Sequence, residues 1–210
     1  MAQLISLSGS PQRMAAATTA ILCLFLILPP VCRGNDFLRP SKSSPNHLEF
    51  PEQITSRPGE ISLLADSAYF ETLTALIKKA RQRIDLAMFL FKASNAADNR
   101  PALLIQELIA ARRRGVQVRV LLELSGHDKN LNKANQEVAE ALEKGGVTAL
   151  FDSKRRTSHS KIVVVDSRYC IVGSHNLSQS ALKYNHELSL LIDNPQLAKK
   201  ILAYMETINR

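Results

Sequence analysis

Residues 60–210 alternate between short apolar runs and longer stretches with apolar residues at helical spacing. Val116, Val118 and Val120 are separated by polar residues, which is the period-two pattern of a strand. Residues 162–165 are continuously apolar and β-branched, which is typical of a strand buried on both faces. Together the runs predict strands over residues 61–64, 84–91, 116–122, 147–151, 162–165, 169–172 and 188–192.

Helices are predicted between these strands, where apolar residues recur three and four positions apart. Ser67 can cap the first helix, and Pro101 suits the first turn of the second. The predicted helices cover residues 68–83, residues from Pro101 to Gly115, residues 133–144, and residues from Pro195 onward. On the last helix, four side chains are expected to point into the core: Leu197, Ile201, Tyr204 and Met205.

This alternation of strands and helices indicates the fold class. Strands that alternate with helical stretches favour a sheet covered by helices rather than a bundle or a sandwich. We therefore predict a single α/β domain over residues 60–210, with a mixed, mostly parallel β-sheet flanked by helices. Its length is that of one ordinary domain.

The residues before this domain have a different character. Residues 15–31 are uncharged and almost wholly apolar, and they lie between Arg13 and Arg33. Residues 1–34 are thus expected to be a signal peptide, which predicts a periplasmic or secreted protein, or a membrane anchor formed by residues 15–31. Residues 35–59 are rich in proline and serine and poor in apolar side chains, so we expect a linker there.

The net charge indicates the class of partner, and the cysteine content excludes an internal disulfide and a zinc site. The chain has a net charge of +8, and residues 1–34 hold only Arg13 and Arg33, so the remainder carries +6. A basic domain favours polyanions, either nucleic acid or an anionic membrane surface. Without the leader only Cys170 remains, which excludes an internal disulfide, and no cysteine–histidine pattern predicts a zinc site.

The most informative segment begins at His159 and Lys161, which stand two residues apart before a predicted buried strand. It continues as HSKIVVVDSRYCIVGSHNLSQSALKYNHE, with Asp166 five residues after Lys161. This His-x-Lys-x4-Asp spacing, followed by Gly-Ser-x-Asn, resembles the HKD signature of the phospholipase D superfamily. The resemblance implies cleavage of a phosphodiester through a covalent phosphohistidine, in an active site that needs two such motifs.

The residue types suit this chemistry. A neutral His159 is a competent nucleophile near pH 7. Lys161 would neutralise the phosphate oxygens, and Ser174 and Asn176 would donate hydrogen bonds to them. Glu187 is expected to be a carboxylate that accepts the other imidazole N–H and so orients the ring.

Two further groups complete the candidate site residues. Asp166 belongs to the expected catalytic motif, and the resemblance implies that it holds a loop through hydrogen bonds rather than carrying a proton. Lys154, Arg155 and Arg156 lie on a polar loop directly before the motif, where they are candidates for nucleic-acid contacts.

A single motif implies a second chain. His127-Asp128-Lys129 imitates the start of the motif, but no Gly-Ser-x-Asn pattern follows it, so it is rejected as a second half. We therefore expect a homodimer in which each protomer contributes one His159 to a shared site on a two-fold axis. The scheme needs no cofactor and no metal.

Two enzymatic functions and one binding function remain open at this point. The chain resembles the small secreted bacterial endonucleases of the superfamily, which implies a non-specific, metal-independent nuclease acting on DNA or RNA. The alternative is a phospholipase D or phosphatidyltransferase that acts on membrane phospholipids, with the N-terminal segment associated with the membrane. A catalytically silent nucleic-acid binding module is the third possibility.

Overall fold

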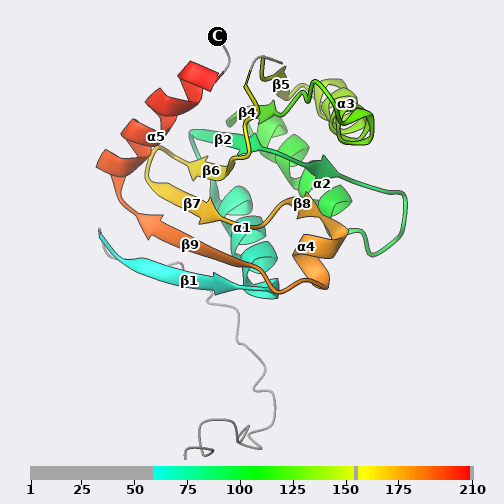
Figure 1. Ribbon diagram of the computed structural model, residues 1–210. Helices are drawn as coiled ribbons and strands as arrows, with labels where there is room; N and C mark the ends of the chain where they lie inside the picture. The colour runs from blue at the N-terminus through cyan, green and yellow to red at the C-terminus, as the bar shows by residue number, and fades with distance from the viewer. Residues whose placement is uncertain (1–58, 154–155, 209–210) are drawn as a thin grey trace, which may run out of the picture. The chain divides into compact units, whose positions relative to one another are not determined.

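The computed structural model describes residues 59–153 and 156–208 (Figure 1). The expected leader, nearly all of the expected linker, and Lys154 and Arg155 lie outside these residues. The elements are, in order, β1 (Ile61–Ala65), α1 (Ser67–Lys79), β2 (Arg83–Met88), β3 (Phe91–Lys92), α2 (Arg100–Arg113), β4 (Gln117–Leu122), α3 (Lys129–Lys144), β5 (Thr148–Phe151), β6 (Lys161–Val165), β7 (Tyr169–Gly173), β8 (Leu177–Ser178), α4 (Gln179–Lys183), β9 (Leu188–Asp193) and α5 (Pro195–Ile208). None of the helices in this part of the chain is long and apolar enough to cross a bilayer.

The expected α/β fold with a mixed sheet is confirmed. Within the described residues, seven strands form one sheet in the order β1-β9-β7-β6-β2-β4-β5. Strands β2, β4 and β5 are parallel neighbours, whereas β6 and β9 run against the strands on either side of them. Five of the seven strands therefore point the same way, although most neighbouring pairs are antiparallel.

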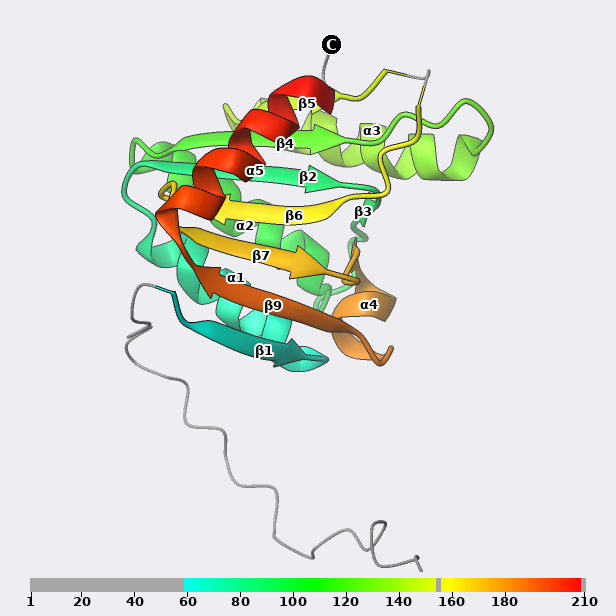
Figure 2. The ribbon, with the colours of Figure 1, turned by 60° about the vertical axis from the view of Figure 1, so that its left-hand side comes forward.

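Helices cover the two faces of this sheet unequally. Helices α1, α2 and α3 lie on one face, and α5 crosses the other (Figure 2). The larger core lies under the three helices and is filled by side chains such as Leu73, Leu104 and Leu142. The smaller core lies between α5 and the sheet and includes Ile162 and Met205.

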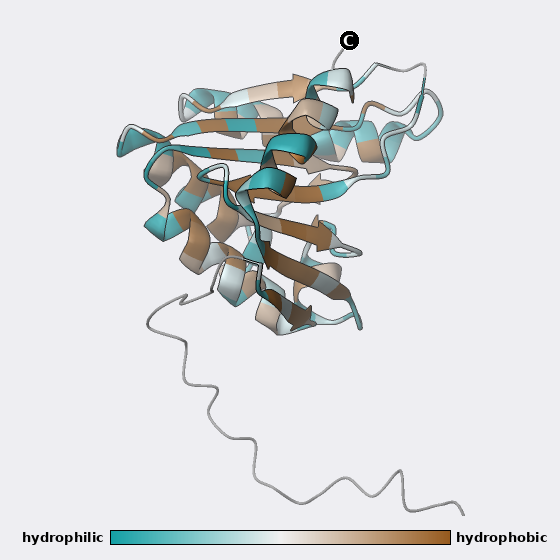
Figure 3. Ribbon diagram, turned by 90° about the vertical axis from the view of Figure 1, so that its left-hand side faces the viewer, coloured by the Kyte–Doolittle hydropathy of each residue, from teal (hydrophilic) through white to brown (hydrophobic). Residues whose placement is uncertain are grey.

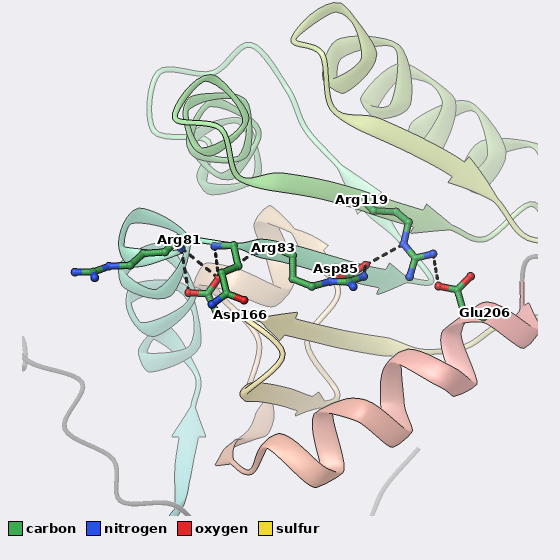
Figure 4. A network of polar contacts seen from close by, with 7 residues as sticks. Arg81, Arg83, Asp85, Arg119, Asp166 and Glu206 are labelled. Carbon is green, nitrogen blue, oxygen red and sulfur yellow. Dashed lines mark hydrogen bonds and ion pairs between the residues drawn. The ribbon is translucent and has the colours of Figure 1, made fainter.

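Ion pairs also attach α5 to the sheet (Figure 4). Asp85 of β2 is 1% exposed, and its carboxylate accepts hydrogen bonds from the guanidinium groups of Arg83, at 2.6 Å, and Arg119, at 2.9 Å. Arg119 also pairs with Glu206 of α5. A buried carboxylate is stable only with such partners, and the cluster therefore links β2, β4 and α5.

Three local expectations are corrected by the structure. The apolar run 84–91 is not one strand: it divides into β2 and β3 because the Phe91 N–H turns to bond the side chain of Asn135 at 2.9 Å. Helix α3 begins four residues before position 133, because the side chain of Asp128 accepts the N–H groups of its first turn. Tyr204 is 52% exposed rather than inward, because Met205 takes the buried position on α5.

Candidate active site

Residues of the motif meet at one edge of the sheet because of the strand register. Lys161 starts β6 opposite Met88, which ends β2, and Gly173 ends β7 opposite Ser189 of β9. Ser174, Asn176 and Glu187 follow or precede these strand ends. The pairing therefore brings the end of β2, the start of β6, the end of β7 and the start of β9 to the same edge of the sheet.

His159 and Lys161 lie together there, as their spacing predicts. The Lys161 ammonium is 3.3 Å from His159 Nδ1 and donates a hydrogen bond of 3.0 Å to the His159 carbonyl. The imidazole packs against the ring of Phe89 with 4.3 Å between centroids, and Lys161 Nζ lies 4.9 Å from the centre of the same ring. Lys161 is buried, whereas His159 is exposed and accessible to a substrate.

Electrostatics favour the neutral imidazole. Desolvation lowers the pKa of His159, and the positive charge of Lys161 lowers it further. Burial also lowers the pKa of Lys161, while the charge of Glu187 opposes that shift. The lowered pKa favours the neutral form of His159 in a single copy of the chain, which is the form that a nucleophile requires.

Phe89 and Glu123 support the His159 segment, and the sequence reasoning missed both. The Phe89 N–H donates to the Ser160 carbonyl at 2.8 Å, and the Glu123 carboxylate accepts the Ser158 N–H at 2.7 Å. Glu123 is 2% exposed; burial raises its pKa, and the nearby Asp152 carboxylate adds to the rise. An acidic residue directly after a buried strand, at the same edge as His159, is a signal that could have identified Glu123.

Asn135 joins these supports from helix α3. Its side chain is fully buried and donates to the carbonyls of Phe89 and Glu123, each at 2.9 Å. The same side chain accepts the Phe91 N–H. A mid-helix asparagine carries no sequence signal for this role, since only the tertiary fold places three strand ends around it.

Ser174 and Glu187 contact each other at the same edge of the sheet, beside the ends of β7 and β9. The Ser174 hydroxyl donates to the Glu187 carboxylate and accepts the Leu188 N–H at 3.1 Å. The Asn185 amide donates to the other carboxylate oxygen of Glu187 at 3.1 Å. In the described chain Glu187 is thus held by Ser174 and Asn185 and makes no hydrogen bond with His159.

Asn176 and His175 are adjacent in the sequence but have different surroundings. The side-chain oxygen of Asn176 is buried without a hydrogen-bond partner among the described residues. His175 lies inward, stacked on Tyr69 at 4.2 Å between centroids, with Nδ1 2.8 Å from the Ser189 hydroxyl. His175 is fully buried, which lowers the pKa of the imidazole, and its stacking and hydrogen bonds make it a structural residue beneath the site.

Asp66, at the turn between β1 and α1, ties that turn to the site. Its carbonyl accepts His175 Nε2–H at 3.1 Å, and its carboxylate accepts the Glu187 N–H at 2.9 Å. The residue has φ 50° and ψ −120°, a backbone conformation outside the regions that L-residues usually adopt. Ser67 is the first residue of α1, and Asp66 rather than Ser67 occupies the N-cap position.

Comparison with known proteins agrees with this arrangement. A family model for the PLD-like domain of cardiolipin synthase matches residues 73–209. The chain belongs to the phospholipase D superfamily. The phospholipase D of Rickettsia conorii is 31% identical over 101 residues, which are 48% of this chain and 48% of that protein. The match spans about half the length of these curated relatives.

Solved structures share the fold. Nuc, a phospholipase D family member from Salmonella typhimurium, has a TM-score of 0.59 at 22% identity, over 71% of this chain and 94% of that one. Phosphatidylserine synthase from Haemophilus influenzae has a TM-score of 0.57 at 17% identity, over 71% of this chain and 38% of that one. At these identities the likeness is one of fold.

Asp166, the aspartate of the superfamily motif, lies away from the other motif residues. It follows the last residue of β6, at the opposite end of that strand from Lys161. Its carboxylate accepts the backbone N–H groups of Arg81, Gln82 and Arg83 at 3.0, 2.8 and 3.1 Å (Figure 4). Asp166 therefore binds the turn between α1 and β2, at the edge of the sheet remote from His159.

Other candidate residues are placed as follows. Arg156 is exposed on the loop before the motif. Asp128 of the His127-Asp128-Lys129 segment caps α3 by accepting the N–H groups of Asn130 and Leu131, each at 3.0 Å. Within residues 59–153 and 156–208, no group of three or more histidine, cysteine and acidic side chains is arranged to hold a metal ion.

Proposed function

We propose that this chain is a metal-independent phosphodiesterase that acts through a covalent phosphohistidine on His159. The observation that carries the proposal is the pairing of an exposed imidazole of lowered pKa with the buried ammonium of Lys161, 3.3 Å away. The first group supplies the nucleophile and the second supplies a fixed positive charge for the phosphate. Ser174 and Asn176 lie at the same edge to donate further hydrogen bonds to the phosphate.

The reaction would run in two displacements. A nitrogen of His159 attacks phosphorus, a P–N bond forms, and the P–O bond to the leaving group breaks. A second, protonated imidazole gives its proton to the leaving oxygen. That imidazole, now neutral, then takes a proton from water; the resulting hydroxide attacks phosphorus, the P–N bond breaks, and both histidines return to their starting states.

The second imidazole is assigned to His159 of another copy of the chain. In the described residues, the only other segment that resembles the motif's start is committed to capping α3. A homodimer would place two half-sites on a two-fold axis. Glu187, held by Ser174 and Asn185, would then accept an imidazole N–H in the assembled site.

Nucleic acid is the proposed substrate. The chain carries a net charge of +8, and the exposed Arg156 lies on the loop that leads to His159. Phosphate contacts of this kind carry no base information, so cleavage should be non-specific. Lys154 and Arg155, which adjoin Arg156 in sequence, are proposed to add to these contacts. Residues 1–34 are proposed to export the protein or to anchor it to the membrane.

A second candidate, phospholipid, follows from the names of the relatives. Phospholipase D is the name of the Rickettsia protein, and phosphatidylserine synthase is the name of one structural neighbour. Both substrates are phosphodiesters, and the same two displacements would cleave either one. The choice between them therefore depends on contacts outside the phosphate itself.

The deciding experiment is a cleavage assay in EDTA with plasmid DNA, single-stranded RNA and phosphatidylcholine vesicles. His159→Ala should abolish cleavage, and His127→Ala, which changes an exposed histidine outside the site, should leave it intact. Cleavage of nucleic acid alone supports the nuclease, and cleavage of lipid alone supports the second candidate. A protein that binds DNA but cleaves none of the substrates, with or without His159, would be the binding module instead.

Active-site sharing has its own test. Heterodimers of wild type with His159→Ala, purified with two different affinity tags, should have almost no activity because each shared site lacks one imidazole. Heterodimers with half the wild-type activity would show that each chain acts alone.

A further inference from the structure

Strands β1 and β9 end side by side at the edge of the sheet that carries the candidate site. Ala65, the last residue of β1, pairs with Leu188, the first residue of β9. Both strands are largely hydrophobic, and hydrophilic segments adjoin them at this end (Figure 3). Asp66 follows β1 and Glu187 precedes β9, so the two acidic residues are neighbours although 121 positions separate them in the sequence.

Asp66 holds the backbone of Glu187 from both sides. Its N–H donates to the Glu187 carbonyl, and its carboxylate accepts the Glu187 N–H, each at 2.9 Å. The other carboxylate oxygen of Asp66 lies 3.1 Å from His186 Nδ1, and the Asp66 carbonyl accepts the Nε2–H of His175. One residue therefore contacts both segments of the chain that carry Ser174 and Glu187.

The backbone of Asp66 has a conformation that favours another residue type. Its φ of 50° and ψ of −120° lie near the mirror image of the extended region, which glycine reaches readily and residues with a Cβ rarely enter. Conformations of this kind persist only where surrounding contacts hold them, and they gather at functional sites. Because the backbone suits glycine, the presence of aspartate points to a role for its side chain.

Helix capping does not account for this side chain. Asp66 is the N-cap residue of α1, a position where an aspartate usually accepts N–H groups of the first helical turn. Asp128 does so at the start of α3, whereas Asp66 makes no such bond. The carboxylate of Asp66 bonds instead to the segment before β9, at His186 and Glu187.

We propose that Asp66 is a positioning residue that fixes the backbone of Glu187, so that the Glu187 carboxylate meets an imidazole of the assembled site. The inference rests on the proposed function, in which Glu187 accepts an imidazole N–H. Ser174 and Asn185 hold that carboxylate, and Asp66 holds the backbone from which it extends. Glu187 stands just outside β9, where a strand end would otherwise fray. A displacement of about 1 Å in such a group can slow a reaction about 100-fold.

The experiment measures kcat, KM and Tm of the full chain, on whichever of plasmid DNA, single-stranded RNA and phosphatidylcholine vesicles the wild type cleaves. Asp66→Gly should lower kcat about 100-fold and leave KM within about threefold, because Glu187 moves but the phosphate contacts remain. Its Tm should change by less than about 3 °C, since the relieved backbone offsets the lost hydrogen bonds.

Two further variants show whether the carboxylate oxygen is responsible. Asp66→Asn retains an acceptor for the Glu187 N–H and should recover kcat to within about fivefold of wild type. Ser67→Ala is the matched control: it changes the next residue, which takes no part in these hydrogen bonds, and should keep the wild-type kcat.

The outcomes separate this inference from the proposed function. If Asp66→Gly cleaves as fast as wild type, or unfolds below the assay temperature, the inference is overturned and the proposed function stands. A loss of kcat that Asp66→Asn does not recover also overturns it. If the wild type cleaves nothing, the proposed function fails, and amide hydrogen exchange decides the inference. Faster exchange of the Glu187 N–H in Asp66→Gly, with unchanged exchange in β2, supports the hold on Glu187, and equal exchange overturns it.

Discussion

Replacing Asp166 should lower the free energy of unfolding of the domain without slowing cleavage of the phosphodiester. Its carboxylate accepts three backbone N–H groups, from Arg81, Gln82 and Arg83. The first two are exposed and regain water, so each contributes about 0.5–1 kcal/mol; the third is partly buried and contributes about 1.5 kcal/mol. Asp166→Ala should therefore lower the free energy of unfolding by about 2–4 kcal/mol.

The backbone of Asp166 adds a second contribution. Asp166 and Ser167 are the central residues of a turn closed by the Arg168 N–H on the Val165 carbonyl, and both have positive φ, at 51° and 53°. Asparagine adopts this conformation more readily than alanine does. Asp166→Asn keeps one acceptor oxygen and the turn preference, so it should cost about half as much as the alanine change.

Thermal unfolding and single-turnover cleavage measure the two effects separately. A loss of about 3 kcal/mol in a domain of this size should lower Tm by roughly 6–12 °C. Since Lys161 lies five residues away along β6, about 17 Å at 3.3 Å per residue, kcat of the folded variant should stay within about threefold of wild type. A loss of 100-fold or more in kcat, measured well below Tm, would refute the structural role and place this carboxylate in the chemistry.

Three further predictions concern the residues around the site. Gly173→Ala should destabilise the domain by about 1–3 kcal/mol in urea titrations, because a Cβ there would collide with the backbone and side chain of Ser189; an unchanged midpoint would contradict the close packing. Burial lowers the folded-state pKa of His175, so the unfolded state binds a proton first and the wild-type protein loses stability as the pH falls from 6.5 to 5. His175→Gln should therefore lose less Tm than wild type over this pH range. Equal slopes of Tm against pH for the two proteins would argue against a buried neutral imidazole. Glu123→Ala should lower kcat about 100-fold with little change in KM, since the Ser158 N–H loses its acceptor and the His159 segment shifts, whereas Glu123→Gln retains an acceptor and should recover most of the rate.

Local periodicity accounts for most of the elements that could be predicted. Every strand of the main sheet and helices α1, α2, α3 and α5 coincide with apolar patterns within a few residues at each end. The spacing of His159 and Lys161 also predicts that they share one side, because residues two apart on an extended chain do so. These features depend on neighbouring residues, which is why the sequence alone contains them.

Features that depend on distant segments could not be predicted in the same way. The place of β6, antiparallel between β2 and β7, is set by pairing between remote parts of the chain. The two-residue strands β3 and β8 are too short for any periodicity. Contacts of Phe89 with His159, and of Glu123 with Ser158, exist only because strand ends far apart in the sequence meet at one edge.

The short turn that joins the antiparallel strands β6 and β7 implies an order of events during folding. Strands β6 and β7 can pair across a short connection, as hairpins do within microseconds. Strand β2 must instead find β6 from a remote part of the chain, and non-local pairing of this kind is slow. Ser174 is carried by the fast hairpin, whereas His159 takes its fixed position only after Phe89 and Glu123 arrive with the slower strands. During refolding, recovery of cleavage should therefore lag behind recovery of strand signal in circular dichroism.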